Sequence, residues 1–432
     1  MTPASFNPSP QRRSVSALLQ RNRLSPSVYQ ALNLALEGHT LSYEQALPLT
    51  TVVGAELLAM QQVADHLRER QVGPVVTYVV NRNINFTNVC IKHCGFCAFS
   101  RDFRTEEGYH LSDDEILRRV QEAVDFGATE VCIQAGLPPK MPGDLYIQLT
   151  RKIKASHPGL LMHAFSPEEV LYGSVRSRCS ILEYLQELKA AGLDSLPGTS
   201  AELLIPGIRD QVAPGRISVE QWLEVIRGAH SLGLPTTSTM MYGFVEEPQH
   251  WLQHMLVLRD LQQETGGFTE FVPLGFVHSE APIYLKKNAA VRAGASGVEV
   301  MRVHALARLF LGTTIANLQV SWVKEGLKLA QVLLQSGVND LGGTLINESI
   351  STAAGSGHGQ RTSPAILHRL IEEVGRQPAQ RNTKYEILRT YEPGEAPASK
   401  LDEVDDERFG SYQQLVSSGQ HRYQRPQPPV PR

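Results

Sequence analysis

Three of the chain's five cysteines stand close together, at Cys90, Cys94 and Cys97, with the spacing C-x3-C-x2-C. Thiolates this close to one another need a cation, and the two common candidates are zinc and an iron–sulfur cluster. Structural zinc usually takes two C-x2-C pairs, and only one such pair is present. The spacing therefore favours an iron–sulfur cluster with three protein ligands. One iron is then left open to a small molecule that chelates through an amine and a carboxylate.

Other metal sites remain as alternatives. His93 or His110 is a possible fourth ligand of a zinc ion, and a zinc- or iron-binding regulatory protein is the alternative from a different functional class. Cys132 and Cys179 stand alone in the sequence, and we expect them to be small buried hydrophobic residues.

Composition and charge exclude several functional classes. The chain has 432 residues, of which 41 are basic and 44 acidic, so its formal net charge is only -3. This balance predicts no general binding of nucleic acid or of an anionic membrane. The N-terminal residues lack the apolar core of a secretory signal, and no run approaches the roughly 20 apolar residues of a membrane span. An odd, clustered set of cysteines indicates no disulfide framework, so we expect a soluble cytoplasmic protein.

From Pro74 onward, short β-branched runs alternate with amphipathic runs. Ser112 with Glu115, and Ser218 with Gln221, are capping-box signatures of two of the expected helices, and Gly233 predicts the end of the second. This alternation predicts an α/β fold with parallel strands, and we expect a (β/α)8 barrel of the TIM type over residues 74–385. A doubly wound open sheet is the alternative. The eight expected strands are residues 75–86, 129–136, 160–165, 193–198, 234–243, 268–276, 317–322 and 338–345.

Two regions flank the expected barrel. Residues 1–73 have helical periodicity and predict an N-terminal helical extension that packs on the outside or bottom of the barrel. Residues 386–432 are rich in proline, charge and polar side chains, which predicts a disordered C-terminal tail.

The cysteine motif, with Phe96 before its last cysteine, resembles the signature of radical S-adenosylmethionine (SAM) enzymes. "NRNINFTNVC" and "GFCAFSRD" resemble the branch that makes the deazaflavin FO and a menaquinone precursor. Within that branch, "FVPLGFVHSEAPIY", "QVSWVKEG" and "GVNDLGGTLINESISTAAGSGHGQ" resemble the tyrosine-cleaving subunit of FO synthase. The resemblance covers roughly residues 74–385. Aminofutalosine synthase and the ring-closing subunit of FO synthase are the rivals within this class.

The resemblance implies a 4Fe-4S cluster bound by Cys90, Cys94 and Cys97, with SAM on the remaining iron. The reduced cluster would cleave SAM to methionine and a 5'-deoxyadenosyl radical. That radical would act on L-tyrosine, whose Cα–Cβ bond breaks. The 4-hydroxybenzyl group would join 5-amino-6-(D-ribitylamino)uracil and 2-iminoacetate would leave. The implied partners are an electron donor and the ring-closing subunit.

The resemblance also implies SAM contacts. Gln134 and Gly136 correspond to a glycine-rich turn that meets the methionine amine, although a plain turn at a strand end remains open. Glu202 would contact the SAM ribose or amine, or else be a carboxylate stabilised by a helix dipole. Phe96 and Met241 would flank the adenine, although methionines at such positions are commonly core residues.

Polar residues gather at the ends of the last expected strands, which predicts the substrate site. Lys324 or Arg216 is expected to hold the tyrosine carboxylate, and Asp340 or Glu348 to accept protons from its amine. Before the first cysteine, we expect side chains to fix the loop by hydrogen bonds to backbone amides, and these side chains are Asn85, Thr87 and Asn88.

Overall fold

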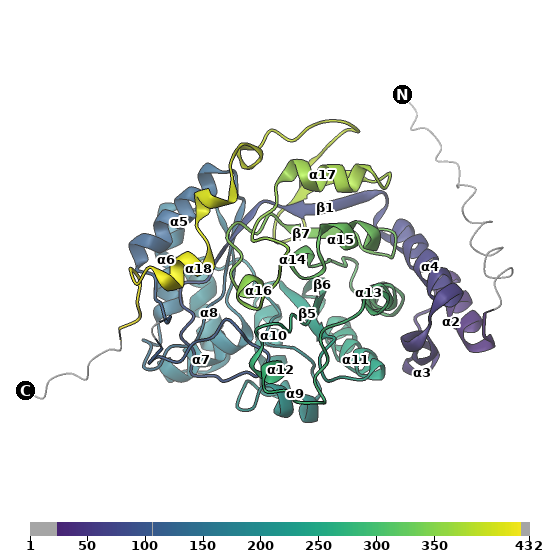
Figure 1. The fold of residues 1–432 in the computed structure, drawn as a ribbon, viewed down its shortest axis with the longest axis horizontal. Coiled ribbons are helices and arrows are strands. Elements are labelled where there is room, and N and C mark those ends of the chain that lie inside the picture. Colours follow the sequence, from purple (N-terminus) through teal and green to yellow (C-terminus); the bar gives the residue numbers. More distant parts are fainter. Residues whose placement is uncertain (1–23, 106, 425–432) are drawn as a thin grey trace, which may run out of the picture.

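The computed structural model describes residues 24–105 and 107–424. Its strands lie at the centre and its helices surround them, which gives an α/β fold (Figure 1). The strands form three sheets, with the orders β7-β1-β8-β9, β2-β3-β4 and β5-β6. They are β1 Val75–Val79, β2 Asn81–Ile84, β3 Glu130–Ile133, β4 Leu161–Ala164, β5 Thr236–Tyr242, β6 Phe268–Gly275, β7 Asp340–Gly343, β8 Gln377–Arg381 and β9 Ile387–Thr390.

No sheet among the described residues closes into a barrel, which differs from the expected single eight-stranded sheet. Residues 193–198 and 317–322 form no regular strand. They take part only in isolated parallel bridges, such as Leu196 with Thr236 and Gln319 with Asp340. Pro197 offers no backbone N–H, which limits pairing in the first of these segments. Apart from β8 with β9, the paired strands are parallel, as predicted.

The strand β8 was not expected from the sequence, because "QPAQR" contains no β-branched or aromatic residue. It pairs with β1 over four residues, from Val75 with Gln377 to Tyr78 with Gln380. This pairing brings Arg381, the last residue of β8, into the interior, where its side chain is buried.

The helices begin where their capping residues predict. The Ser112 hydroxyl accepts the Glu115 N–H, and Ser218 forms a complete capping box with Gln221. Gly233 follows the second of these helices with φ +71°, a conformation that favours glycine. The helices after β2 are α5 Asp113–Asp125, α6 Leu145–Ser156, α7 Pro167–Ser177, α8 Ile181–Ala191, α9 Pro206–Val212, α10 Val219–Ser231, α11 Pro248–Thr265, α12 Pro282–Leu285, α13 Gly297–Leu311, α14 Trp322–Glu325, α15 Leu327–Leu333, α16 Ile350–Ala353, α17 Pro364–Glu372 and α18 Tyr412–Ser417.

The N-terminal helices lie outside the strands, against α11 and α13 (Figure 1). Arg259 of α11 donates to the Leu41 carbonyl at 2.8 Å, and Arg302 of α13 donates to the Val52 carbonyl at 2.8 Å. Residues 1–23 of the expected extension lie outside the described residues. The described elements are α2 Pro26–Leu36, α3 Tyr43–Ala46, the 3-10 helix η1 Leu47–Thr51 and α4 Gly54–Val72.

The expectation of a disordered tail is wrong for residues 386–424. Two 3-10 helices, η2 Lys400–Glu403 and η3 Asp406–Phe409, precede α18, and the segment crosses the molecule beside α5 (Figure 1). Leu401, Phe409 and Tyr412 are buried. Sparse apolar anchors in a polar sequence are therefore enough to order this segment, because the fold provides sites that bury each of them. Residues 425–432 lie outside the described residues.

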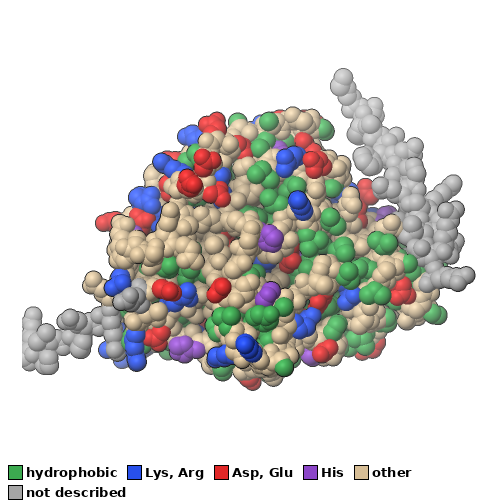
Figure 2. Space-filling view, in the orientation of Figure 1, with side chains coloured by type: hydrophobic (Ala, Val, Ile, Leu, Met, Phe, Trp, Pro, Cys, Tyr) green, Lys and Arg blue, Asp and Glu red, His purple; other side chains and the backbone are tan. Residues whose placement is uncertain are grey.

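Charge is mixed over the face seen in Figure 2, where acidic and basic side chains are interspersed. This agrees with the near balance of 41 basic and 44 acidic residues. Among the described helices, none is long and apolar enough to cross a membrane.

Candidate active site

A cavity of about 400 Å³ is lined by residues of the strands and by the cysteine motif. Ten of the eleven residues predicted for the site line this cavity, and they come from segments far apart in the sequence. Asp340 is the exception. The ten are Cys90, Phe96, Cys94, Cys97, Gln134, Gly136, Glu202, Met241, Lys324 and Glu348.

The cysteine loop, which we define as residues 85–105, is held by the polar residues that precede the first cysteine. Asn88 Oδ1 accepts the Tyr109 N–H at 2.9 Å, and Thr87 Oγ1 accepts the Val89 N–H at 3.2 Å. Asn85 differs from the expectation, because its amide donates to the Gln134 carbonyl at 2.8 Å. The predicted fixing of the loop is therefore confirmed for Thr87 and Asn88.

All three thiols of the motif reach the cavity. Burial raises the pKa of Cys94 to about 12 and also raises the pKa of Cys90. A buried thiol with a raised pKa keeps its proton unless a cation replaces it, as happens when a metal centre binds. The Lys92 N–H points at Cys90 Sγ, 3.4 Å away, so the loop backbone already offers a hydrogen bond to this sulfur.

Arg216 is the cation nearest the motif. Its Nη1 donates to Cys94 Sγ at 3.4 Å and lies 3.5 Å from Glu202 Oε1. Its Nε lies 3.4 Å from Glu168 Oε2, and its Nη2 donates to the Ser200 hydroxyl at 2.5 Å. These contacts occupy the guanidinium, so Arg216 joins the cysteine loop to Glu202. It is therefore not free to bind the tyrosine carboxylate, the role expected for it or Lys324.

Gly136 lies against the cysteine loop. Its N–H donates to the Thr87 carbonyl at 2.8 Å, and an added Cβ would meet the Val89 carbonyl oxygen at 2.4 Å. Only glycine allows this approach, since other residues would push the loop away. The neighbouring Ala135 N–H donates to Glu169 Oε1 at 3.0 Å. The turn therefore positions the loop, and its predicted contact with SAM stays a prediction.

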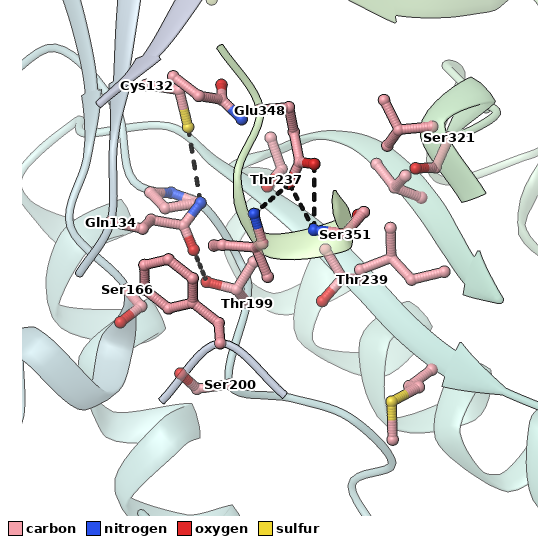
Figure 3. A pocket seen from close by; sticks show the side chains of 18 of the residues that line it. Cys132, Gln134, Ser166, Thr199, Ser200, Thr237, Thr239, Ser321, Glu348 and Ser351 are labelled. Carbon is pink, nitrogen blue, oxygen red and sulfur yellow. Dashed lines mark hydrogen bonds between the residues drawn. The ribbon is translucent and has the colours of Figure 1, made fainter. Parts of the chain in front are cut away.

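Gln134 bridges two walls of the cavity (Figure 3). Its amide nitrogen points at Cys132 Sγ at 3.5 Å, and its oxygen accepts the Thr199 hydroxyl at 2.8 Å. Cys132, expected to be a buried hydrophobic residue, thus lines the cavity as well. Met241 also lines it, and its N–H donates to the Glu202 carbonyl at 2.8 Å.

Lys324 and Glu348 reach the cavity from its other side. Glu348 accepts the N–H groups of Ile350 and Ser351, each at 3.0 Å, and Figure 3 shows it facing Ser351. Burial raises the pKa of Glu348 and lowers that of Lys324, whose charged form Glu348 in turn favours. The ammonium of Lys324 makes no hydrogen bond or ion pair with another described residue. An acidic and a basic side chain thus face one space.

Asp340 lies beneath the cavity rather than on its wall. Its carboxylate pairs with Arg381, at 2.6 Å from Nε, and accepts the Thr77 hydroxyl and the Gly342 N–H. Through these partners, the Asp340 carboxylate connects β7 to β1 and β8. Its predicted proton-accepting role stays a prediction.

The inner end of the cavity holds polar residues that the sequence reasoning missed. They are Asn83, Glu130, His163, Glu270, Gln319, Arg381 and Thr383. One signal was available, because Glu130 and Cys132 alternate with apolar residues in β3 and so share a face with Gln134. Arg381, the last residue of β8, and Thr383, two residues after it, gave no such signal, since this segment has no strand-like pattern.

The thiols do not form a site for a single ion. Within residues 24–105 and 107–424, no three His, Cys, Asp or Glu side chains are placed to hold one metal ion, and this includes His93 and His110. A cluster makes a different demand, because each cysteine binds a different iron atom. Three cysteines of one loop on one wall of a shielded cavity fit that demand.

Known protein families match most of the chain. Residues 84–258 match the radical SAM superfamily, and residues 265–393 match the CofH/MqnC C-terminal region. A 5-amino-6-(D-ribitylamino)uracil–L-tyrosine 4-hydroxyphenyl transferase of Methanopyrus kandleri is 46% identical over 366 residues, which are 84% of this chain and 98% of that protein. The chain belongs to this family of radical SAM transferases.

Further relatives agree with membership of the transferase family. The protein of the same name from Methanothermobacter thermautotrophicus is 47% identical over 80% of this chain and 94% of its own length. An FO synthase of Mycobacterium tuberculosis is 48% identical over 79% of this chain and 40% of its own length. Among solved structures, the hydrogenase maturase HydG from Carboxydothermus hydrogenoformans has a TM-score of 0.64 at 15% identity, covering 87% of this chain and 84% of that one. Methylornithine synthase (PylB) has a TM-score of 0.61 at 16% identity, covering 81% and 97%. These two likenesses confirm the α/β fold of the chain, in which no sheet among the described residues closes into a barrel.

Proposed function

We propose that this chain is a 5-amino-6-(D-ribitylamino)uracil–L-tyrosine 4-hydroxyphenyl transferase. Identity of 46–48% with three proteins of that name, over 91–98% of their length, carries the proposal. In the overall reaction, the Cα–Cβ bond of tyrosine breaks and the 4-hydroxybenzyl carbon bonds to the uracil. The remaining part of tyrosine leaves as 2-iminoacetate, with methionine and 5'-deoxyadenosine derived from SAM.

Cys90, Cys94 and Cys97 would hold a 4Fe-4S cluster, and SAM would bind beside it against Phe96, Gln134 and Glu202. When bound, the cluster and SAM supply the one-electron chemistry that starts the reaction. Arg216 keeps Glu202 and the cysteine loop at a fixed separation through its contacts with both.

The chain's other contribution is to orient the substrates. Lys324 provides an ammonium for the tyrosine carboxylate, and Glu348 provides a carboxylate for its amino group. Glu348 itself is held by the N–H groups of Ile350 and Ser351, so it offers a fixed acceptor. A fixed pair of opposite charges suits an amino acid, whose own charges are one carbon apart. Glu348 is buried and Lys324 half-buried, which strengthens these interactions by limiting access of water.

Two further features belong to this proposal. The strands would together form the eight-stranded barrel, which the parallel bridges of Leu196 with Thr236 and of Phe271 with Leu318 support. The partners would be an electron donor and the ring-closing enzyme that consumes the hydroxybenzyl–uracil product. The donor would supply the electron that starts SAM cleavage.

A product assay tests the proposal. Anaerobically reconstituted protein would receive reductant, SAM, ring-labelled tyrosine and 5-amino-6-(D-ribitylamino)uracil, with mass spectrometry of the small molecules. We expect a labelled hydroxybenzyl–uracil adduct together with 5'-deoxyadenosine, and neither from the Cys94→Ala protein. Deoxyadenosine without the adduct would reject this substrate pair. An aminofutalosine synthase would instead form its product when an enolpyruvyl substrate replaces the uracil.

A further inference from the structure

The inner end of the cavity contains two buried acceptors without donors. Glu130 is only 3% exposed, and its Oε2 has no hydrogen-bond partner, while its Oε1 receives a long bond of 3.4 Å from the Asn81 amide. Asn83 Oδ1 is likewise buried and unpartnered. Both residues line the cavity. An acceptor left unpaired in the interior is destabilising, so such groups are uncommon unless a ligand satisfies them.

The strand register places these acceptors among other polar groups. Asn83 is the partner of Cys132, and Cys132 is the partner of His163. His163 Nδ1 bonds the Ser195 hydroxyl at 2.7 Å, and its Nε2 bonds no other described residue. Burial lowers the pKa of His163 to about 3, so its ring is neutral at physiological pH. Thr383 adds a buried hydroxyl to the same end of the cavity. Its oxygen also bonds the Ser195 hydroxyl at 2.7 Å and lies 3.3 Å from His163 Nδ1, so it has room for one further hydrogen bond.

This polar end is separated from the cysteine loop. Glu130 begins β3, and Gln134 at the other end of the strand faces Thr199 near the loop. Four residues of a strand span about 13 Å. A ligand group bound at Glu130 is therefore the part of a substrate that lies farthest from the three cysteines.

We propose that this end of the cavity binds the ribityl chain of 5-amino-6-(D-ribitylamino)uracil, and this inference rests on the proposed function. A ribityl chain carries hydroxyls on successive carbons, and each hydroxyl both donates and accepts a hydrogen bond. It can therefore pair with Glu130 Oε2, as donor to the carboxylate or as acceptor from the carboxylic acid, and donate to Asn83 Oδ1 while bonding His163 and Thr383. The four groups form a set that matches a neutral polyol.

The other substrate groups fit this end less well. The phenol of tyrosine has a single O–H donor, so it would leave one of the two acceptors unpaired and retain that acceptor's desolvation cost. A tyrosine carboxylate would need a free cation there, and Arg381 is already paired with Asp340 at 2.6 Å and Glu270 at 3.4 Å. Lys324, at the other side of the cavity, is the cation without a partner among the described residues.

Binding measurements on the holoenzyme test the inference. Anaerobic equilibrium dialysis would compare the wild type with Glu130→Met and Asn83→Leu, which keep the side-chain size and remove the acceptors. The two ligands would be 5-amino-6-(D-ribitylamino)uracil and 5,6-diaminouracil, which lacks the chain. We expect each variant to weaken binding of the ribityl compound about tenfold or more, since a lost hydrogen bond to a buried acceptor is of that size. Binding of 5,6-diaminouracil and of L-tyrosine should stay unchanged, which also shows that the variants fold.

Three results would contradict the inference, and they differ from one another. Equal weakening of both uracils in the variants would assign these residues to the ring instead of the chain. Weaker tyrosine binding with unchanged uracil binding would place tyrosine at this end. A wild-type protein that binds neither uracil would overturn the proposed function itself, before any variant is measured.

Discussion

The ring of Tyr412 lies 5.6 Å from the ring of Phe99, centroid to centroid, so α18 packs directly on the cysteine loop. Asn88 also donates to the Tyr412 hydroxyl, at 3.5 Å, and the Tyr423 N–H donates to the Gly108 carbonyl at 2.8 Å. The match to the CofH/MqnC region ends at residue 393, so these contacts come from beyond it. The C-terminal segment thus supports the loop that would carry the cluster.

We expect Tyr412→Ala to loosen that loop. Truncating a buried aromatic side chain typically lowers the free energy of unfolding by about 3–5 kcal/mol, and here the void opens beside Phe99. The variant should therefore melt earlier and hold less iron and sulfide after reconstitution. Tyr412→Phe is the matched control, because it keeps the ring and should bind iron as the wild type does. A Tyr412→Ala protein with full iron content would show that the segment does not support the loop.

Gly136→Ala should displace the same loop from its other side. The added Cβ would meet the Val89 carbonyl oxygen at 2.4 Å, which no ordinary contact allows. We expect a loss of stability of about 1–3 kcal/mol and a lower iron content, because either Val89 or the turn must shift. Gly159→Ala is the control, since its Cβ would meet nothing within 4 Å. Equal behaviour of the two variants in thermal melts and iron assays would refute this account of Gly136.

The cysteines should divide into two functional groups. Replacing Cys90, Cys94 or Cys97 with alanine should abolish SAM cleavage and the visible absorption of the reconstituted cluster, because each thiolate would bind a different iron. Cys132→Ala and Cys179→Ala should retain both properties. Chromatographic measurement of 5'-deoxyadenosine, together with the absorption spectrum, would decide this. Robust SAM cleavage by the Cys94→Ala protein would contradict the cluster assignment.

Lys324→Met should reduce the use of tyrosine more than the binding of SAM. Loss of one charge-assisted hydrogen bond predicts a decrease of about 10- to 100-fold in kcat/KM for tyrosine. Lys328→Met is the control, because that lysine is exposed. Steady-state kinetics with varied tyrosine, and SAM binding by equilibrium dialysis, separate the two effects. If SAM binding falls while the KM for tyrosine is unchanged, Lys324 belongs to the cofactor site.

Glu130 should make stability depend on pH. Burial raises its pKa to about 7 in the folded protein, against 4.5 for an unperturbed carboxyl. Between these values the folded protein keeps a proton that the unfolded chain has lost. Stability from this group is therefore present below pH 4.5 and is lost as pH rises toward 7. Glu130→Gln cannot titrate, so the variant should gain stability relative to the wild type, by about 1–3 kcal/mol, between pH 5 and pH 7.5.

Chemical denaturation of both proteins at several pH values measures that difference. Other buried carboxyls, such as Glu169 with a pKa raised by burial to about 7, are common to both proteins and cancel in the comparison. A constant difference across this pH range would show that Glu130 does not change its proton affinity on folding.

Much of the site was predictable because its signals are local in the sequence. The spacing of Cys90, Cys94 and Cys97 is set by the cofactor that such a loop binds. It can therefore be recognised from the sequence without knowing which residues pack against the loop. Ser112 and Ser218 marked helix starts for the same reason, since a cap acts within one turn. The amino-acid sequences of the longer motifs indicated the family.

The tertiary structure decided what depends on distant partners. Arg381 enters the interior on a strand without a strand-like pattern, and its pairing removes Asp340 from the cavity wall. Tyr412 is ordered by Phe99, more than 300 residues away, although its own surroundings in the sequence are polar and charged. Glu130 becomes an unpaired acceptor only because the strands around it bury it. Local composition predicts whether a segment can fold alone, whereas burial and pairing are properties of the groups that the fold brings together.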